Sequence, residues 1–327
     1  MERRAVLMAV MAGVAGAPLR LFARDKPWRV GFFYLGSRQS AMETNRYTPF
    51  IEGMRELGYE EGKQYVLVAR FADSAYERLP AIAAELAAAD LDVVVSTATG
   101  THNALKKATT TLPIVSTNMI DPVREGFADT LAHPGRNFTG LSTQFSERLP
   151  KNLEFLRMAM PRLSRLAALW TPGNATHTPL LKDLDAVARG ESIRVVHVGA
   201  STPREIDSGF ATMARERVEA FIILGDALFV QQFRQIAEGA AKHHLASIYS
   251  AAEYPEFGGL MSYGPSFREN YRRAAVFVDK ILKGAKPGDL PFEQPMKFEL
   301  VINRKTARTI GLPLSQELLL RADRVIE

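Results

Sequence analysis

The feature that most constrains the fold is the regular alternation of short apolar runs with longer amphipathic segments. Runs such as 28–35, 92–96 and 220–224 are almost entirely apolar and have the length of a strand. Each is followed by a stretch with helical spacing of its apolar residues. Strands that are apolar along their whole length are buried on both faces, as in parallel sheets covered by helices. The alternation therefore predicts an α/β chain built from doubly wound parallel sheets.

The predicted elements form two series, which fits two domains in a chain of 327 residues. Two such lobes would face each other across a central cleft. We expect a loop over 36–45, and a helix that opens at Asp121-Pro122, because Asp caps helices well and Pro favours their first position. The expected strands are 28–35, 64–70, 92–96, 113–117, 166–170, 193–198, 220–224, 246–249, 260–263 and 297–302. The expected helices are 46–57, 76–89, one from Thr101, 147–160, 174–189, 203–217, 227–243, one ending near Lys283, and 304–310.

The first residues read as an export signal rather than as part of the fold. Arg3-Arg4 precede an uncharged, apolar stretch from Ala5 to Leu19, which is too short for a comfortable membrane span. Small residues permit cleavage after Ala17 or after Ala23, so we expect a signal peptide within residues 1–23. The arginine pair leaves a twin-arginine export route open, and a buried N-terminal helix is the alternative. With no Cys in the chain, the exported protein is not lipidated.

Composition and motifs exclude several classes of chemistry. Zero Cys removes disulfides, cysteine nucleophiles and thiolate metal sites, and no two of the six His are spaced i, i+4. Phosphate-binding glycine loops, nucleophile elbows and zinc-protease motifs are missing. The 41 basic and 36 acidic residues are dispersed, without the clustering that nucleic acid requires. We therefore expect no enzyme, metal, cofactor or nucleic-acid partner.

Polar and tyrosine side chains gather where the predicted strands end. In doubly wound sheets, ligands bind beyond the carboxyl ends of the strands. Hydroxyls, amides and single carboxylates in these loops would suit a small polar ligand. The alternatives are that loops favour such residues anyway and that Asp121 and Asn174 cap helices. His102 could contact a ligand, or could be a polar residue at a helix start. The candidate ligand-binding residues are Tyr34, Ser37, Ser96, Thr97, Thr101, Asn118, Asp121, Asn174, Asp226, Tyr249 and Tyr254.

Several segments, in their order and spacing, resemble a known family. The sharpest are GGLMSYG at 258–264, ILKGAKP at 281–287 and KFELVIN at 297–303, supported by GMRELGYEEG at 53–62 and PGRNFTG at 134–140. Together they resemble the substrate-binding proteins of ABC transporters, in the group that includes tryptophan- and tyrosine-associated receptors of bacteria.

The resemblance implies the type I periplasmic-binding fold, in which three crossover hinge strands join two α/β lobes. It places crossings near Thr143, Gly264 and Pro295. The lobes would then be discontinuous, with 28–142 plus 265–293 in the N-terminal lobe and 143–264 plus 294–327 in the C-terminal lobe.

The resemblance also implies a function. The protein would be a monomeric periplasmic receptor that captures a small polar solute, such as an amino acid, aromatic ones included, and delivers it to a membrane ABC permease. A ligand-sensing receptor for a signalling partner and a secreted enzyme on the same fold are the alternatives. For an amino acid, we expect its ammonium at Asp226. The carboxylate would meet Ser96, Thr97 and Thr101 at a helix start. Tyr34, Tyr249 and Tyr254 would stack on the side chain, and Asn118, Asp121 and Asn174 would complete the polar set.

Overall fold

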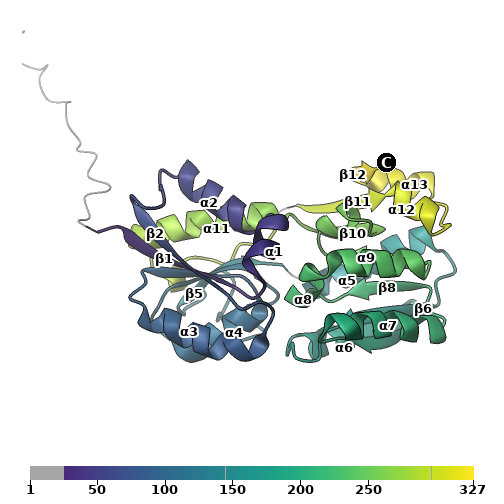
Figure 1. Ribbon diagram of the computed structural model, residues 1–327, viewed down its shortest axis with the longest axis horizontal. Helices are drawn as coiled ribbons and strands as arrows, with labels where there is room; N and C mark the ends of the chain where they lie inside the picture. Colours follow the sequence, from purple (N-terminus) through teal and green to yellow (C-terminus); the bar gives the residue numbers. More distant parts are fainter. Residues whose placement is uncertain (1–25, 144, 296) are drawn as a thin grey trace, which may run out of the picture.

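The computed structural model describes residues 26–143, 145–295 and 297–327, and these form two α/β lobes (Figure 1). The expected signal peptide, residues 1–23, lies outside the described residues. Among the residues that are described, no helix is long and apolar enough to cross a membrane.

The first lobe is a five-stranded sheet in the order β2-β1-β3-β4-β5, with every neighbouring pair parallel. Side chains alternate between its faces, so Phe32 packs with Phe50 on one face and Phe33 packs with Leu105 on the other. Helices cover both faces, which explains the fully apolar strands. The strands are β1 (Trp28–Tyr34), β2 (Tyr65–Phe71), β3 (Val93–Ser96), β4 (Ile114–Met119) and β5 (Phe138–Ser142). The helices are α2 (Tyr47–Glu56) and α11 (Phe267–Leu282) on the first face, and α3 (Leu79–Ala88) and α4 (Thr99–Ala108) on the second.

The second lobe is a seven-stranded sheet in the order β12-β11-β10-β9-β8-β6-β7. Its strands are β6 (Arg165–Trp170), β7 (Arg194–Gly199), β8 (Ala220–Ile223), β9 (Ala246–Tyr249), β10 (Met261–Pro265), β11 (Phe298–Asn303) and β12 (Arg324–Ile326). Its main helices are α5 (Phe145–Ala159) and α6 (His177–Gly190) on one face, and α7 (Pro203–Arg215) and α9 (Phe233–Lys242) on the other. The β10–β11 pair alone among these is antiparallel, because β10 runs out toward the first lobe and β11 returns from it.

The chain passes between the lobes three times: between β5 and α5, between β10 and α11, and in the segment that precedes β11. Helix α11 packs against α2 and β4, so it belongs with the first sheet although it follows β10 in the chain. Leu141 of β5 bridges to Glu293, which ties two of the crossings together. At Gly264 the backbone is so close to the loop after β9 that a Cβ would collide with the Ser250 carbonyl oxygen. The lobe boundaries expected from the sequence stay a prediction that this layout supports.

The structure differs from the sequence prediction in some local elements. The expected loop over 36–45 contains a short helix, α1 (Arg38–Glu43), and the expected helix 227–243 is divided at Gln232 into α8 (Ala227–Gln231) and α9. The prediction of a helix that opens at Asp121-Pro122 is wrong. The Asp121 carboxylate does accept the Arg124 N–H at 2.9 Å, but Gly126 has φ +70° and the segment closes as successive turns. Missed elements are β5, α10 (Glu253–Glu256), α13 (Gln316–Arg321) and β12, whereas α12 (Arg304–Thr309) matches.

Candidate ligand-binding site

A pocket opens between the lobes at the carboxyl ends of their strands. Its empty volume is about 860 Å³, counting the solvent at its mouth. That is the size range of sites for small organic ligands. Both lobes contribute to the wall, so a ligand here touches both at once. The first lobe supplies Tyr34, Arg46, Tyr76, Thr97, Thr99, Asn118 and Tyr271; the second supplies Phe145, Arg148, Asn174, Asp226, Ser250 and Tyr254.

One part of the wall is the start of α4, directly after β3. Thr101 Oγ1 lies 2.8 Å from Ser96 Oγ and accepts the Ala98 N–H at 3.1 Å, which holds the strand-to-helix turn. Thr97 donates its hydroxyl to the Phe33 carbonyl at 2.9 Å. Because these bonds fix the turn, the first residues of the helix, beginning with Thr99, lie on the pocket wall. The positive end of a helix dipole favours a bound anion at this place.

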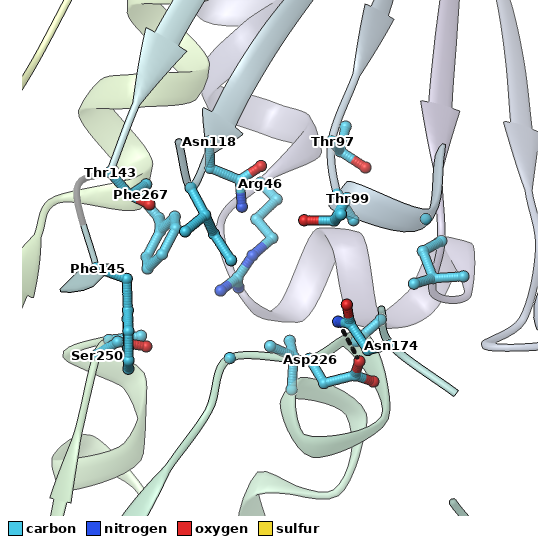
Figure 2. A pocket seen from close by; sticks show the side chains of 18 of the residues that line it. Arg46, Thr97, Thr99, Asn118, Thr143, Phe145, Asn174, Asp226, Ser250 and Phe267 are labelled. Atoms are coloured by element: carbon cyan, nitrogen blue, oxygen red, sulfur yellow. Dashed lines mark hydrogen bonds between the residues drawn. The ribbon is translucent and has the colours of Figure 1, made fainter. Parts of the chain in front are cut away.

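Asp226 faces this helix start from the second lobe. It caps α8, with Oδ1 accepting the Leu228 N–H at 3.0 Å. Its Oδ2 accepts the Tyr76 hydroxyl at 2.5 Å and the Asn174 amide at 3.0 Å, the latter marked in Figure 2. Tyr76 belongs to the first lobe, in a short 3-10 turn (Tyr76–Arg78), so this bond joins the lobes. Burial and the neighbouring Asp226 carboxylate raise the pKa of Tyr76 far above its usual range, so it acts as a donor.

No cationic side chain of the described residues forms an ion pair with the Asp226 carboxylate. His177 packs close by, but burial lowers its pKa although Asp226 opposes the effect. The Thr171 N–H donates to Nδ1 of His177 at 3.0 Å, so the ring proton is on Nε2, which faces the Gly225 carbonyl at 3.2 Å. His177 is therefore neutral. Asp226 forms no ion pair with any other described residue and is only 6% exposed.

The pocket has two chemically different ends. Figure 2 places Thr97, Thr99, Asn174 and Asp226 at one side, and Thr143, Phe145, Ser250 and Phe267 at the other, with Arg46 and Asn118 between them. Tyr254 also lines the wall, and its ring stacks on Tyr249 with centroids 4.3 Å apart. One end therefore suits a charged, hydrogen-bonding group, and the other, with the rings of Phe145 and Phe267, suits an aromatic one.

Arg46, which precedes α2, is a second link between the lobes. It is 5% exposed, and Nη1 donates to the Thr44 carbonyl at 3.0 Å and to Glu253 Oε1 of the second lobe at 3.2 Å. Burial alone would lower the pKa of Arg46, but Glu253 and the surrounding tyrosines raise it above its ordinary value. With the Tyr76–Asp226 bond, this ion pair holds the cleft in a closed arrangement.

The structure brings together six of the eleven candidate residues: Tyr34, Thr97, Asn118, Asn174, Asp226 and Tyr254 line the pocket. The other five lie outside the wall and have local partners. Ser37 caps α1, Ser96 and Thr101 bond to each other, Asp121 accepts the Arg124 N–H, and Tyr249 stacks behind Tyr254. His102 also lies outside; it is fully buried with Nε2 facing the Ser96 carbonyl, and burial lowers its pKa to about 4.

Sequence reasoning missed Arg46, Tyr76, Thr99, Phe145, Arg148, Ser250, Phe267 and Tyr271. Ser250 directly follows β9, so the rule that ligands bind beyond the carboxyl ends of the strands could have identified it. The others stand at helix starts or within helices, where no local pattern separates them from surface or core residues. Across 26–143, 145–295 and 297–327, no group of three or more His, Asp or Glu is placed to hold a metal ion.

Comparisons with known proteins agree with this architecture. The family model described as "ABC transporter substrate binding protein" matches residues 39–326. A "Tyrosine-binding protein" of Clostridioides difficile (strain R20291) is 22% identical over 263 residues, which cover 80% of this chain and 75% of the relative. A solved conserved domain protein from Vibrio cholerae superposes with a TM-score of 0.84 at 26% identity, covering 92% of this chain and 100% of that one. The ABC domain in complex with L-Trp from Streptococcus pneumonia superposes with a TM-score of 0.83 at 23% identity and the same coverage, which shows a shared fold.

Proposed function

Since the chain belongs to the ABC transporter substrate-binding protein family, we propose that it captures an α-amino acid between its lobes and delivers it to a membrane ABC permease. The observation that carries this proposal is the pairing inside one pocket of an unbalanced carboxylate, Asp226, with the start of α4 across the cleft. An α-amino acid presents the complementary pair of charges. The names of two similar proteins, one tyrosine-binding and one solved with L-Trp, support the same ligand class.

The ligand's ammonium group would lie at Asp226. Oδ2 of that carboxylate already accepts two hydrogen bonds, from the Tyr76 hydroxyl and the Asn174 amide. Oδ1 accepts one, from the Leu228 N–H, so it keeps a lone pair for an ammonium donor. A charge-assisted bond formed in a pocket shielded from water is among the stronger polar interactions.

The ligand's carboxylate would lie at the start of α4, where the backbone N–H groups of the first turn and the hydroxyl of Thr99 would donate to it, since the Thr97 hydroxyl already donates to the Phe33 carbonyl. With the charged groups fixed in this way, the side chain would extend past Arg46 toward Phe145 and Phe267. That end offers ring faces and would accept a large apolar or aromatic side chain.

Ligand capture would work by hinge closure. The three crossings are the only covalent links between the sheets in the described residues, and Tyr76–Asp226 and Arg46–Glu253 close the cleft across them. A ligand that contacts both lobes stabilises the closed state in proportion to its greater affinity for that state. The permease would then distinguish the closed receptor from the open one.

The site of action follows from the proposed export signal. We propose that residues 1–23 direct the chain across the inner membrane, and that it works in the periplasm as a monomer without a lipid anchor. This part of the proposal rests on the sequence alone.

A thermal-shift screen of the purified protein against the twenty standard amino acids tests the proposal. A ligand present at 100 times its dissociation constant adds about 2.7 kcal/mol to the free energy of unfolding. We expect at least one amino acid to raise the melting temperature clearly, with a preference for large side chains. No shift with any amino acid would contradict the proposed ligand class.

A further inference from the structure

Arg148 lies at the aromatic end of the pocket, where the three chain crossings meet. Its guanidinium carbon is 5.0 Å from the ring centroid of Phe145 and 5.5 Å from that of Phe298. Nη1 donates to the Tyr263 carbonyl at 2.9 Å. Phe145 follows the first crossing, Tyr263 precedes the second, and Phe298 follows the third. One side chain thus contacts all three crossings and also lines the pocket.

The positive charge of Arg148 is not balanced within the described part of the chain. The residue is 4% exposed, Nε is buried without an acceptor, and no described carboxylate forms an ion pair with it. Burial lowers its pKa to about 10. A buried charge with unmet hydrogen-bonding capacity costs stability unless a partner is supplied.

Arg46 in the same pocket is a buried arginine whose charge is balanced by an ion pair. It is just as buried, at 5% exposed, but it has Glu253 at 3.2 Å and the Thr44 carbonyl at 3.0 Å. Arg148 has one carbonyl and two ring faces instead. The difference assigns the two arginines to different tasks: Arg46 joins the lobes, whereas Arg148 has capacity left for a group that enters the pocket.

We propose that Arg148 is a specificity-determining residue, which binds an oxygen acceptor at the far end of the ligand's side chain. The proposal rests on the proposed function, because the amino acid's charged groups at Asp226 and α4 direct its side chain toward Phe145. A side chain that ends in a phenolic oxygen or a carboxylate would satisfy the guanidinium. A side chain that ends in hydrocarbon would fill the same space and leave it unsatisfied.

Three amino acids with the same ring test this directly: phenylalanine, tyrosine and 4-carboxyphenylalanine, titrated by calorimetry. They carry no acceptor, a neutral acceptor and an anionic acceptor at the same position. A hydrogen bond to a charged donor contributes roughly 10- to 100-fold in affinity. We expect tyrosine, 4-carboxyphenylalanine or both to bind more tightly than phenylalanine by about that factor, and the order of the two identifies which acceptor the site prefers.

The variant Arg148→Met should reduce this discrimination to within about twofold while phenylalanine still binds. Arg162→Met, the same change at an exposed position beyond the end of α5, is the matched control and should keep the wild-type preference. Equal affinity for all three ligands in the wild type, or discrimination that survives Arg148→Met, overturns the inference and leaves the proposed function standing. If Arg148→Met does not fold, the wild-type series and Arg148→Lys decide. Failure of every amino acid to bind contradicts the proposed function itself.

Discussion

The two ends of the pocket differ in what they can recognise. The end with Asp226 and the start of α4 carries an unbalanced negative charge facing backbone donors. The opposite end carries ring faces and Arg148, an unbalanced positive charge. Every α-amino acid has the same ammonium and carboxylate, so the first end would set affinity for the whole class. The second end meets the side chain, so it would set the choice within the class.

The ends also differ in how the chain builds them. The Asp226 end consists of short loops that follow β3 and β8, and each is held by local caps, such as the Asp226–Leu228 and Thr101–Ala98 bonds. The Phe145 end is assembled where three crossings from distant parts of the sequence converge. The first end is therefore held by bonds within its loops and by the Tyr76–Asp226 bond between the lobes, whereas the second depends on contacts between segments far apart in the sequence.

The largest expected effect is that of Asp226→Asn. The change removes the charge that would bind the ammonium but keeps the size of the side chain, so we expect affinity to fall by roughly 100-fold or more for every amino acid alike. Equilibrium dialysis with two ligands of different size measures this. Asp90→Asn is the control. Asp90 is exposed and lies before the amino end of β3, whereas the pocket lies at the carboxyl ends of the strands. Its φ of +51° is one that Asn tolerates. Unchanged affinity in Asp226→Asn would remove this residue from the site.

A smaller and selective loss should follow from Phe145→Leu. Removing one stacking ring weakens aromatic contacts by about 0.5–1.5 kcal/mol, so we expect a roughly 3- to 10-fold loss for aromatic amino acids. Small amino acids such as alanine and serine should bind as they do in the wild type. Calorimetry on both ligand classes gives the comparison. An equal loss for alanine would show that the two ends are not independent.

The variant Tyr76→Phe should weaken the closed state without touching either end's choice of ligand. It removes the hydroxyl that donates to Asp226 across the lobes. That hydrogen bond stabilises the closed state by about 1–2 kcal/mol. We expect a uniform loss of affinity of up to roughly tenfold. Small-angle scattering should show a larger radius of gyration for the ligand-free variant than for the ligand-free wild type. A preference that changes between ligands would contradict this role.

The smallest effect on binding is expected from His102, which supports α4 from behind the pocket. Burial lowers its pKa to about 4 in the folded protein, against 6.5 for an unfolded chain. The unfolded state therefore takes up a proton first, and stability falls as the pH drops from 6.5 toward 4. Glu125, whose pKa burial raises to about 7, acts with the opposite sign in part of this window.

The contribution of His102 is isolated by comparison with His102→Gln. Between pH 7 and pH 4.5, the free energy of unfolding should fall by about 2 kcal/mol more in the wild type than in the variant. Urea denaturation at the two pH values measures the difference. Parallel curves would show that His102 takes up a proton equally in both states.

The sequence was sufficient to predict the architecture, because strands that are buried on both faces are apolar along their whole length. The fully apolar run at 93–95 predicts a central strand, and it is completely buried in the sheet. Asp226 and Asn174 were also within reach, since each follows a strand at the carboxyl edge of its sheet. Ser37, Ser96 and Thr101 satisfy the same rule, yet they stabilise their own turns.

The residues that sequence reasoning missed depend on contacts between distant segments. Arg46 precedes a helix, and nothing nearby indicates that Glu253, 207 positions later, is its partner. Arg148 is one of two arginines in its helix, and its burial arises only where the three crossings converge. Local patterns therefore identify the end of the pocket that would bind the shared charged groups, and tertiary structure supplies the end that would choose among ligands.

The most direct test of this account compares one amino acid with its two truncated forms. The amino acid that gives the largest thermal shift would be titrated alongside its decarboxylated amine and its deaminated acid. If the ammonium lies at Asp226 and the carboxylate at the start of α4, each truncated form should bind roughly 100-fold more weakly than the intact amino acid. An amine or acid that binds as tightly as the parent amino acid would contradict the central claim.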